Sequence, residues 1–148
     1  MSRQFITQKL EDGWKADEGF IPWKPHPKQQ LFLGLEHEEA LKDQGIVEAL
    51  FGGSTGGSKT VAMLMAALKY VHVSNYSALL LRRNFPDLEQ EGGMINLAHE
   101  WLQNTTARWS ENSKTYTFPS GATLRFGHMN SEMDKFRYQG GEYQFIGF

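Results

Sequence analysis

The amino-acid sequence predicts an α/β domain with a mainly parallel sheet, flanked by helices and carrying an added β-hairpin. Short apolar runs at residues 46–51 (IVEALF) and 77–81 (SALLL) have the length and composition of buried strands. Segments with helical patterns at residues 59–72 and 86–102 alternate with these strands, which is typical of a parallel sheet. Alternating apolar residues at 115–118 and 124–126 flank a Pro-Ser-Gly turn and predict the hairpin.

Composition narrows the class of protein. The 148 residues suffice for one domain with a real core, and 13% aromatic residues argue against wholesale disorder. A formal charge of −2 excludes a uniformly basic nucleic-acid coat, although a local basic groove stays open. The absence of cysteine excludes a disulfide scaffold, a thiolate zinc site and a cysteine nucleophile. We expect neither a signal peptide nor a membrane span, because the longest apolar run, residues 61–68, is far shorter than the roughly 20 residues that a span needs.

The chain divides into an arm and a domain. Residues 1–22 are polar, lack a clear period and are expected to form an irregular N-terminal arm, while residues 23–148 form the α/β domain. Pro27 suits the first turn of a helix that reaches residue 35, and residues 36–44 could add a further turn or two before Gly45. Residues 86–102 hold one or two helices broken near residues 92–93, Ser131 caps a short helix over residues 131–138, and residues 143–148 are the last strand candidate.

The glycine-rich stretch between the first strand and the next helix carries the chemistry. It matches the P-loop pattern G-x-x-x-x-G-K-[ST], except that Ser58 replaces the second glycine. Small residues let several backbone N–H groups face one anion, and the helix directs its positive end to the same place. We therefore expect a P-loop NTPase that binds ATP and Mg²⁺, with Lys59 at the β- and γ-phosphates and Thr60 on the metal. The predicted nucleotide-binding residues of the loop are Gly53, Ser54, Thr55, Gly56, Gly57, Ser58, Lys59 and Thr60. The alternative is a glycine-rich turn with an ordinary surface lysine.

A second signal precedes the loop. A glutamine amide can donate to and accept from the edge of adenine, so Gln29 is the candidate that selects ATP over GTP. Gln30 and a merely solvated role for both residues are the alternatives. Arg82 and Arg83 follow the second strand, at the end where α/β sheets place ligands, and a solvated pair is the competing interpretation. The five histidines lack the spacing of a helical metal pair.

Several segments in this order resemble one family. They are a P-x-P-K-Q segment, F-G-G-x-x-G-G-x-K-T, the run RRNFPDL after the second strand, and the run FPSGATLRF followed by RYQGGEYQFIGF. From about residue 22 to residue 148 the chain resembles the ATPase half of the terminase large subunit of tailed bacteriophages, the hydrolase that packages viral DNA. The resemblance implies a RecA-like (ASCE) P-loop fold, Lys59 as a catalytic residue, and Arg137 as an arginine finger acting on the γ-phosphate across a subunit interface. It also implies a homo-oligomeric ring, double-stranded DNA, portal and small terminase subunit as partners, and a place in the host cytoplasm and transiently on the procapsid.

In that family, adjacent Asp and Glu follow the strand that corresponds to residues 143–148, and a nuclease domain comes later. The resemblance therefore leads us to expect a partial ATPase domain that binds ATP but lacks the carboxylates needed to hydrolyse it. Two alternatives remain open at this point. One is a helicase-like P-loop ATPase, and the other is a non-catalytic module that docks on a portal or a small terminase subunit.

Overall fold

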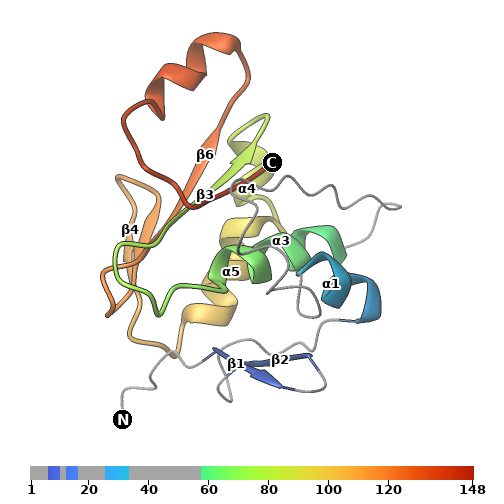
Figure 1. The fold of residues 1–148 in the computed structure, drawn as a ribbon. Helices are drawn as coiled ribbons and strands as arrows, with labels where there is room; N and C mark the ends of the chain where they lie inside the picture. The colour runs from blue at the N-terminus through green and yellow to red at the C-terminus, as the bar shows by residue number, and fades with distance from the viewer. Residues whose placement is uncertain (1–6, 11–12, 17–25, 34–57) are drawn as a thin grey trace, which may run out of the picture.

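The computed structural model describes residues 7–10, 13–16, 26–33 and 58–148 (Figure 1). The predicted strand at residues 46–51, the extra helical turns at 36–44 and the glycine-rich residues 53–57 lie outside the described residues. The described part is α/β, with a mixed sheet of five strands in the order β4-β5-β6-β3-β7. The strands are β3 (Ser77–Arg82), β4 (Arg108–Ser110), β5 (Thr115–Thr117), β6 (Thr123–His128) and β7 (Phe145–Gly147).

Strand β3 organises the sheet. It pairs in parallel with β6, from Ser77 opposite Thr123 to Arg82 opposite His128, and in parallel with β7 on its other side. The hairpin strands β4 and β5 add two antiparallel pairings. The described sheet is therefore mixed: both pairings of β3 are parallel, and the antiparallel pairings all involve the hairpin strands added beside β6.

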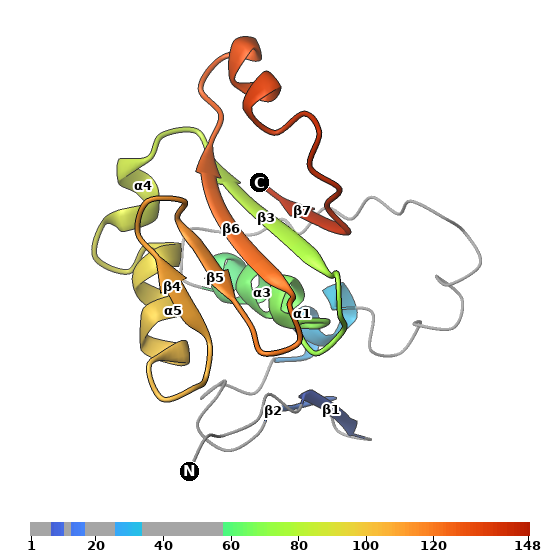
Figure 2. The ribbon, with the colours of Figure 1, turned by 90° about the vertical axis from the view of Figure 1, so that its left-hand side faces the viewer.

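Helices pack on one face of the sheet, as the view turned by 90° shows (Figure 2). Alternate residues of β3 divide between the two faces: Ala78 and Leu80 belong to the core beneath the helices, whereas Leu79 and Leu81 line a pocket on the opposite face. Trp101 is 1% exposed and anchors the core. The helices are α1 (Pro27–Phe32), α3 (Ser58–Leu68), α4 (Pro86–Glu89) and α5 (Met94–Leu102). None of the helices within the described ranges has both the length and the apolar character needed to cross a membrane.

Helix α3 begins at Ser58, one residue before the predicted start, and ends at Leu68, four residues before the predicted end. Aromatic and β-branched residues follow, and they are weaker helix formers than the Ala, Leu and Met of α3. The chain leaves the helix through tight turns in which Lys69 and Val71 donate to carbonyls three residues back. Asn75, two residues before the start of β3, then adopts a positive φ of 64°.

Other predicted elements show where sequence patterns were sufficient and where they were not. The break between α4 and α5 and the β5–β6 hairpin are confirmed. Within the predicted irregular arm, β1 (Thr7–Leu10) and β2 (Gly13–Ala16) instead form an antiparallel pair. The predicted short helix is the 3₁₀ helix η1 (Glu132–Arg137), with Ser131 at its N-cap as expected. There the Asp134 carboxylate accepts hydrogen bonds from the backbone N–H groups of Asn130 and Ser131, at 3.0 and 2.9 Å, and these bonds lower its pKa.

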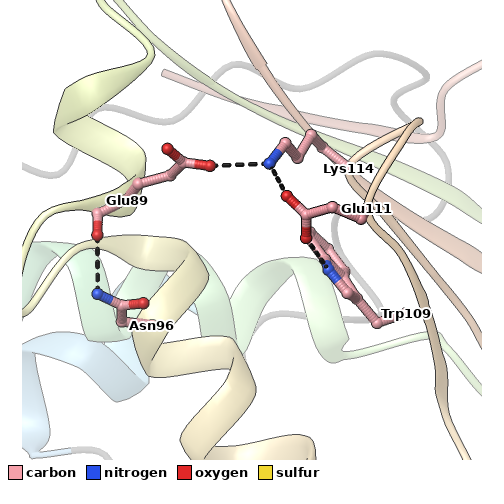
Figure 3. A network of polar contacts seen from close by, with 5 residues as sticks. All are labelled: Glu89, Asn96, Trp109, Glu111 and Lys114. Atoms are coloured by element: carbon pink, nitrogen blue, oxygen red, sulfur yellow. Dashed lines mark hydrogen bonds and ion pairs between the residues drawn. The ribbon is translucent and has the colours of Figure 1, made fainter.

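A polar network ties the β4–β5 hairpin to α4 (Figure 3). Lys114 stands in the hairpin turn at a positive φ of 49°, and its Nζ lies 2.8 Å from Glu89 Oε1. The same ammonium group also pairs with Glu111, whose other carboxylate oxygen accepts from the Trp109 indole N–H at 2.7 Å. Because both carboxylates are exposed, each ion pair contributes little to the stability of the fold. Together, the two ion pairs hold the hairpin against the segment that follows β3.

Candidate functional site

The first turn of α3 opens onto a pocket at the carboxyl ends of β3 and β7. The pocket has a volume of about 260 Å³, and Lys59 and Thr60 line it from α3. Arg82, the last residue of β3, and Phe148, the residue after β7, line it from the sheet. Because β3 and β7 run in parallel, their carboxyl ends meet at this edge, which is where open α/β sheets bind ligands.

The electrostatics of this pocket favour an anion. Lys59 and Arg82 are both cationic, the first turn of α3 carries no acidic side chain, and the positive end of the helix dipole adds to their charge. The Thr60 side chain supplies a hydroxyl at the same turn. Burial lowers the pKa of the Arg82 guanidinium below its ordinary value, while the Asp87 carboxylate acts in the opposite direction. The arrangement can hold a polyanion such as a phosphate chain, with a hydroxyl available to a hard cation.

The structure thus brings together three residues that the sequence singled out: Lys59, Thr60 and Arg82. Arg83 is exposed and does not line the pocket, so the two neighbouring arginines have different surroundings. Gly53, Ser54, Thr55, Gly56 and Gly57 lie outside the described residues, and Ser58 is described only as the first residue of α3.

Gln29 is buried, with 3% of its surface exposed, in the first turn of α1. Its Oε1 accepts a hydrogen bond of 3.0 Å from the backbone N–H of His26, just before the helix begins. This is the side-chain-to-backbone half of a capping box, so Gln29 stabilises the start of α1. Phe32, one turn further along α1, lines the pocket together with Lys59, which places α1 beside the site.

Arg137 does not line this pocket. It ends η1 with a side chain that is 59% exposed, and its Nε lies 3.5 Å from the Asp134 carboxylate. Its Nη1 lies 3.2 Å from Nε2 of His128, at the end of β6. Since β6 runs parallel to β3, η1 follows the same edge of the sheet as the pocket, and Figure 2 shows it extending beyond that edge.

Sequence reasoning missed three lining residues, namely Phe32, Met63 and Phe148. Met63 follows Lys59 by four residues, so helical spacing alone puts both side chains on one face of α3. Phe148 could have been found because the predicted last strand ends there. Phe32 carries no such signal, because only the packing of α1 beside α3 brings it to the pocket.

A larger pocket of about 620 Å³ lies elsewhere, where α1 and the turns after α3 approach the start of β7. Its lining is chiefly apolar and includes Leu33, Tyr70, Tyr76 and Phe145. Lys69 is its one charged lining residue among those described, and the Lys69 ammonium donates to the Leu33 carbonyl at 3.0 Å. The smaller pocket is therefore the better candidate for charged chemistry.

Comparison with known proteins gives the family of the chain. Residues 50–148 match the family model described as terminase large subunit, T4likevirus-type, N-terminal. No curated protein and no solved structure matches the chain. The matched region includes α3, the whole five-stranded sheet and most of the pocket lining. The chain therefore belongs to the N-terminal family of the bacteriophage terminase large subunit, a component of the motor that packages viral DNA.

Proposed function

We propose that the chain binds ATP with Mg²⁺ in the pocket at the first turn of α3. The observation that carries this proposal is the convergence of Lys59 and Thr60 with Arg82 at the carboxyl edge of parallel strands. The residues before α3 supply the P-loop pattern, and membership of the terminase large subunit family supports the same assignment.

Each residue then has a role that its chemistry suits. The Lys59 ammonium binds the β- and γ-phosphates, and the Thr60 hydroxyl is a ligand to Mg²⁺. From the sequence pattern alone, residues 53–58 are the proposed phosphate-binding loop. Gln29 does not line the pocket in this structure, and it remains the proposed reader of the adenine edge. When bound, Mg²⁺ supplies charge neutralisation at the phosphate oxygens.

In the packaging motor, we infer that ATP hydrolysis at this site drives DNA translocation into the capsid. Arg137 is the candidate to reach the γ-phosphate of a neighbouring subunit, which its exposed position permits. The proposed partners are double-stranded DNA, the portal, the small terminase subunit and further copies in a ring. We place the protein in the host cytoplasm and transiently on the procapsid.

Calorimetric titration with Mg·ATP tests the binding site directly. We expect Lys59→Ala to weaken binding by about tenfold or more, because a charge-assisted contact to phosphate contributes roughly 1.5–3 kcal/mol. Lys135→Ala is the matched control, since it removes the same charge from an exposed position on η1 that does not line the pocket. Equal affinity of the unmodified chain and the Lys59→Ala variant would contradict the proposal.

The metal role of Thr60 needs a separate measurement. We expect Thr60→Ala to reduce the gain in ATP affinity that Mg²⁺ produces, while ATP binding in the presence of EDTA changes little. Thr60→Ser keeps the hydroxyl and should keep the Mg²⁺ effect. If Thr60→Ala responds to Mg²⁺ as the unmodified chain does, Thr60 is not the metal ligand.

A further inference from the structure

Arg82 occupies an unusual position for an arginine. It ends the buried strand β3, and its side chain is partly buried against α3 rather than extended into solvent. Its Nη1 lies 3.9 Å from the sulfur of Met63, one turn beyond Lys59 and Thr60 on the same helix. The guanidinium therefore approaches the first turns of α3 from the sheet side of the pocket.

The contacts of this guanidinium leave most of its donors unused within the described structure. Besides the Met63 thioether, a weak acceptor, Nη1 contacts only the carbonyl oxygen of its neighbour Leu81, at 3.4 Å. No carboxylate of the described ranges forms an ion pair with it, and Asp87 acts on it only at longer range. The guanidinium lines the pocket, so its unused N–H donors are available there to the oxygens of an anion.

Arg83 provides the contrast within the same dipeptide. Its side chain is exposed and outside the pocket lining, as the alternation of side chains at a strand end requires. Lys59 approaches the pocket from the helix, whereas Arg82 approaches it from the end of β3, so the two cations can contact different parts of one phosphate chain.

We propose that Arg82 is a phosphate-binding residue that makes this pocket prefer a nucleoside triphosphate to the diphosphate, by contacting the terminal phosphate. The inference rests on the proposed ATP site and adds a residue from the sheet to a site otherwise built on the P-loop. Guanidinium suits this task because it donates two parallel hydrogen bonds to phosphate oxygens. It also links the occupant of the pocket to the β3 end, and thereby to the segment that leads into α4.

The test compares affinities for Mg·AMP-PNP, a triphosphate analogue that resists hydrolysis, and for Mg·ADP. Arg82→Gln keeps much of the side-chain length against Met63 and removes the charge, and Arg83→Gln is the matched control. We expect Arg82→Gln to lower the ratio of AMP-PNP affinity to ADP affinity by about tenfold, as loss of one charged hydrogen-bonded contact predicts. Arg83→Gln should leave the ratio within about twofold.

Arg82→Lys refines the experiment, because it keeps the charge and loses the two-pronged geometry, and we expect an intermediate ratio. Thermal unfolding of each variant without nucleotide establishes that the fold is retained. An unchanged ratio in Arg82→Gln, or equal weakening of both nucleotides, overturns the role of Arg82 while Lys59 continues to support the ATP site. If the unmodified chain binds neither nucleotide, the proposed function fails and this inference fails with it.

Discussion

His99 and Tyr116 join α5 to the hairpin through a pair of neutral side chains. Tyr116 is buried, and burial raises the pKa of its phenol to about 12, so the hydroxyl keeps its proton. Burial lowers the pKa of His99, although Glu111 opposes this change and Lys114 adds to it. The Tyr116 hydroxyl and Nδ1 of His99 form a hydrogen bond with each other, and the imidazole also stands edge-on to Trp109 at 4.7 Å between ring centroids.

This pair predicts a loss of stability in mildly acidic solution. The folded pKa of His99 lies below the unfolded value, so between the two values the unfolded chain binds more protons. The free energy of unfolding should therefore fall as the pH drops below about 6.5. Urea unfolding at pH 7.5 and pH 5.5 measures the difference, which should shrink in His99→Gln. An identical pH dependence in that variant would show that His99 is not the responsible group.

The Gln29 side chain has an observed role beside its proposed contact to adenine, because its Oε1 accepts a hydrogen bond from the His26 backbone N–H and caps α1. Gln29→Ala should thus lower stability slightly, by roughly 0.5–1 kcal/mol for the lost cap. If Gln29 also reads adenine, the ratio of ATP to GTP affinity should fall in Gln29→Ala and stay constant in Gln30→Ala. The ratio isolates base choice, since a general weakening of the fold affects both nucleotides equally. A fall in Gln30→Ala alone would transfer the role to Gln30.

At the scale of elements, β7 packs closely against α3 because Gly147 lacks a side chain. A Cβ on Gly147 would lie 2.9 Å from Leu80 Cδ2 and 2.9 Å from the sulfur of Met63. Gly147→Ala should lower the free energy of unfolding by about 1 kcal/mol through overpacking. Truncating Met63 should relieve this overpacking. The loss of unfolding free energy in the double variant Gly147→Ala/Met63→Ala should therefore be smaller than the sum of the losses in the two single variants. Strict additivity in urea unfolding would argue against this contact.

Elements with a strong local signal were predictable. The apolar run of β3, the glycine break between α4 and α5 and the hairpin turn after Phe118 each depend on neighbouring residues, and each is confirmed. Strand β4 was not predicted, because its three residues include only one half-buried apolar side chain, Trp109. Its place in the sheet comes from pairing with β5, which a pattern along the chain does not encode.

At the scale of the whole molecule, the candidate site also has residues that the sequence could predict and residues that it could not. Lys59 and Thr60 could be chosen from the loop pattern, and Arg82 from its position after a strand, because both signals are local. That Arg82 and not Arg83 lines the pocket depends on which side of β3 faces α3, and that Phe32 reaches it depends on the packing of α1. These facts belong to tertiary structure: the sequence leaves Arg82 and Arg83 as alternatives and gives no signal for Phe32.

Because the pocket joins α1, α3, β3 and β7, its occupant should stabilise the whole fold. A ligand that binds only the folded state adds RT ln(1 + [L]/Kd), about 2.7 kcal/mol at a concentration 100 times Kd. For a domain of this size, that free energy corresponds to an increase in melting temperature of roughly 5–15 °C.

Calorimetric melting with Mg·ATP should show this increase for the unmodified chain and little of it for Lys59→Ala at the same nucleotide concentration. Lys135→Ala again serves as the control and should retain the increase. An increase of equal size in the Lys59→Ala variant would mean that the stabilising nucleotide binds away from α3. If the melting temperature of the unmodified chain is the same with and without Mg·ATP, the nucleotide does not stabilise the fold and the prediction is wrong.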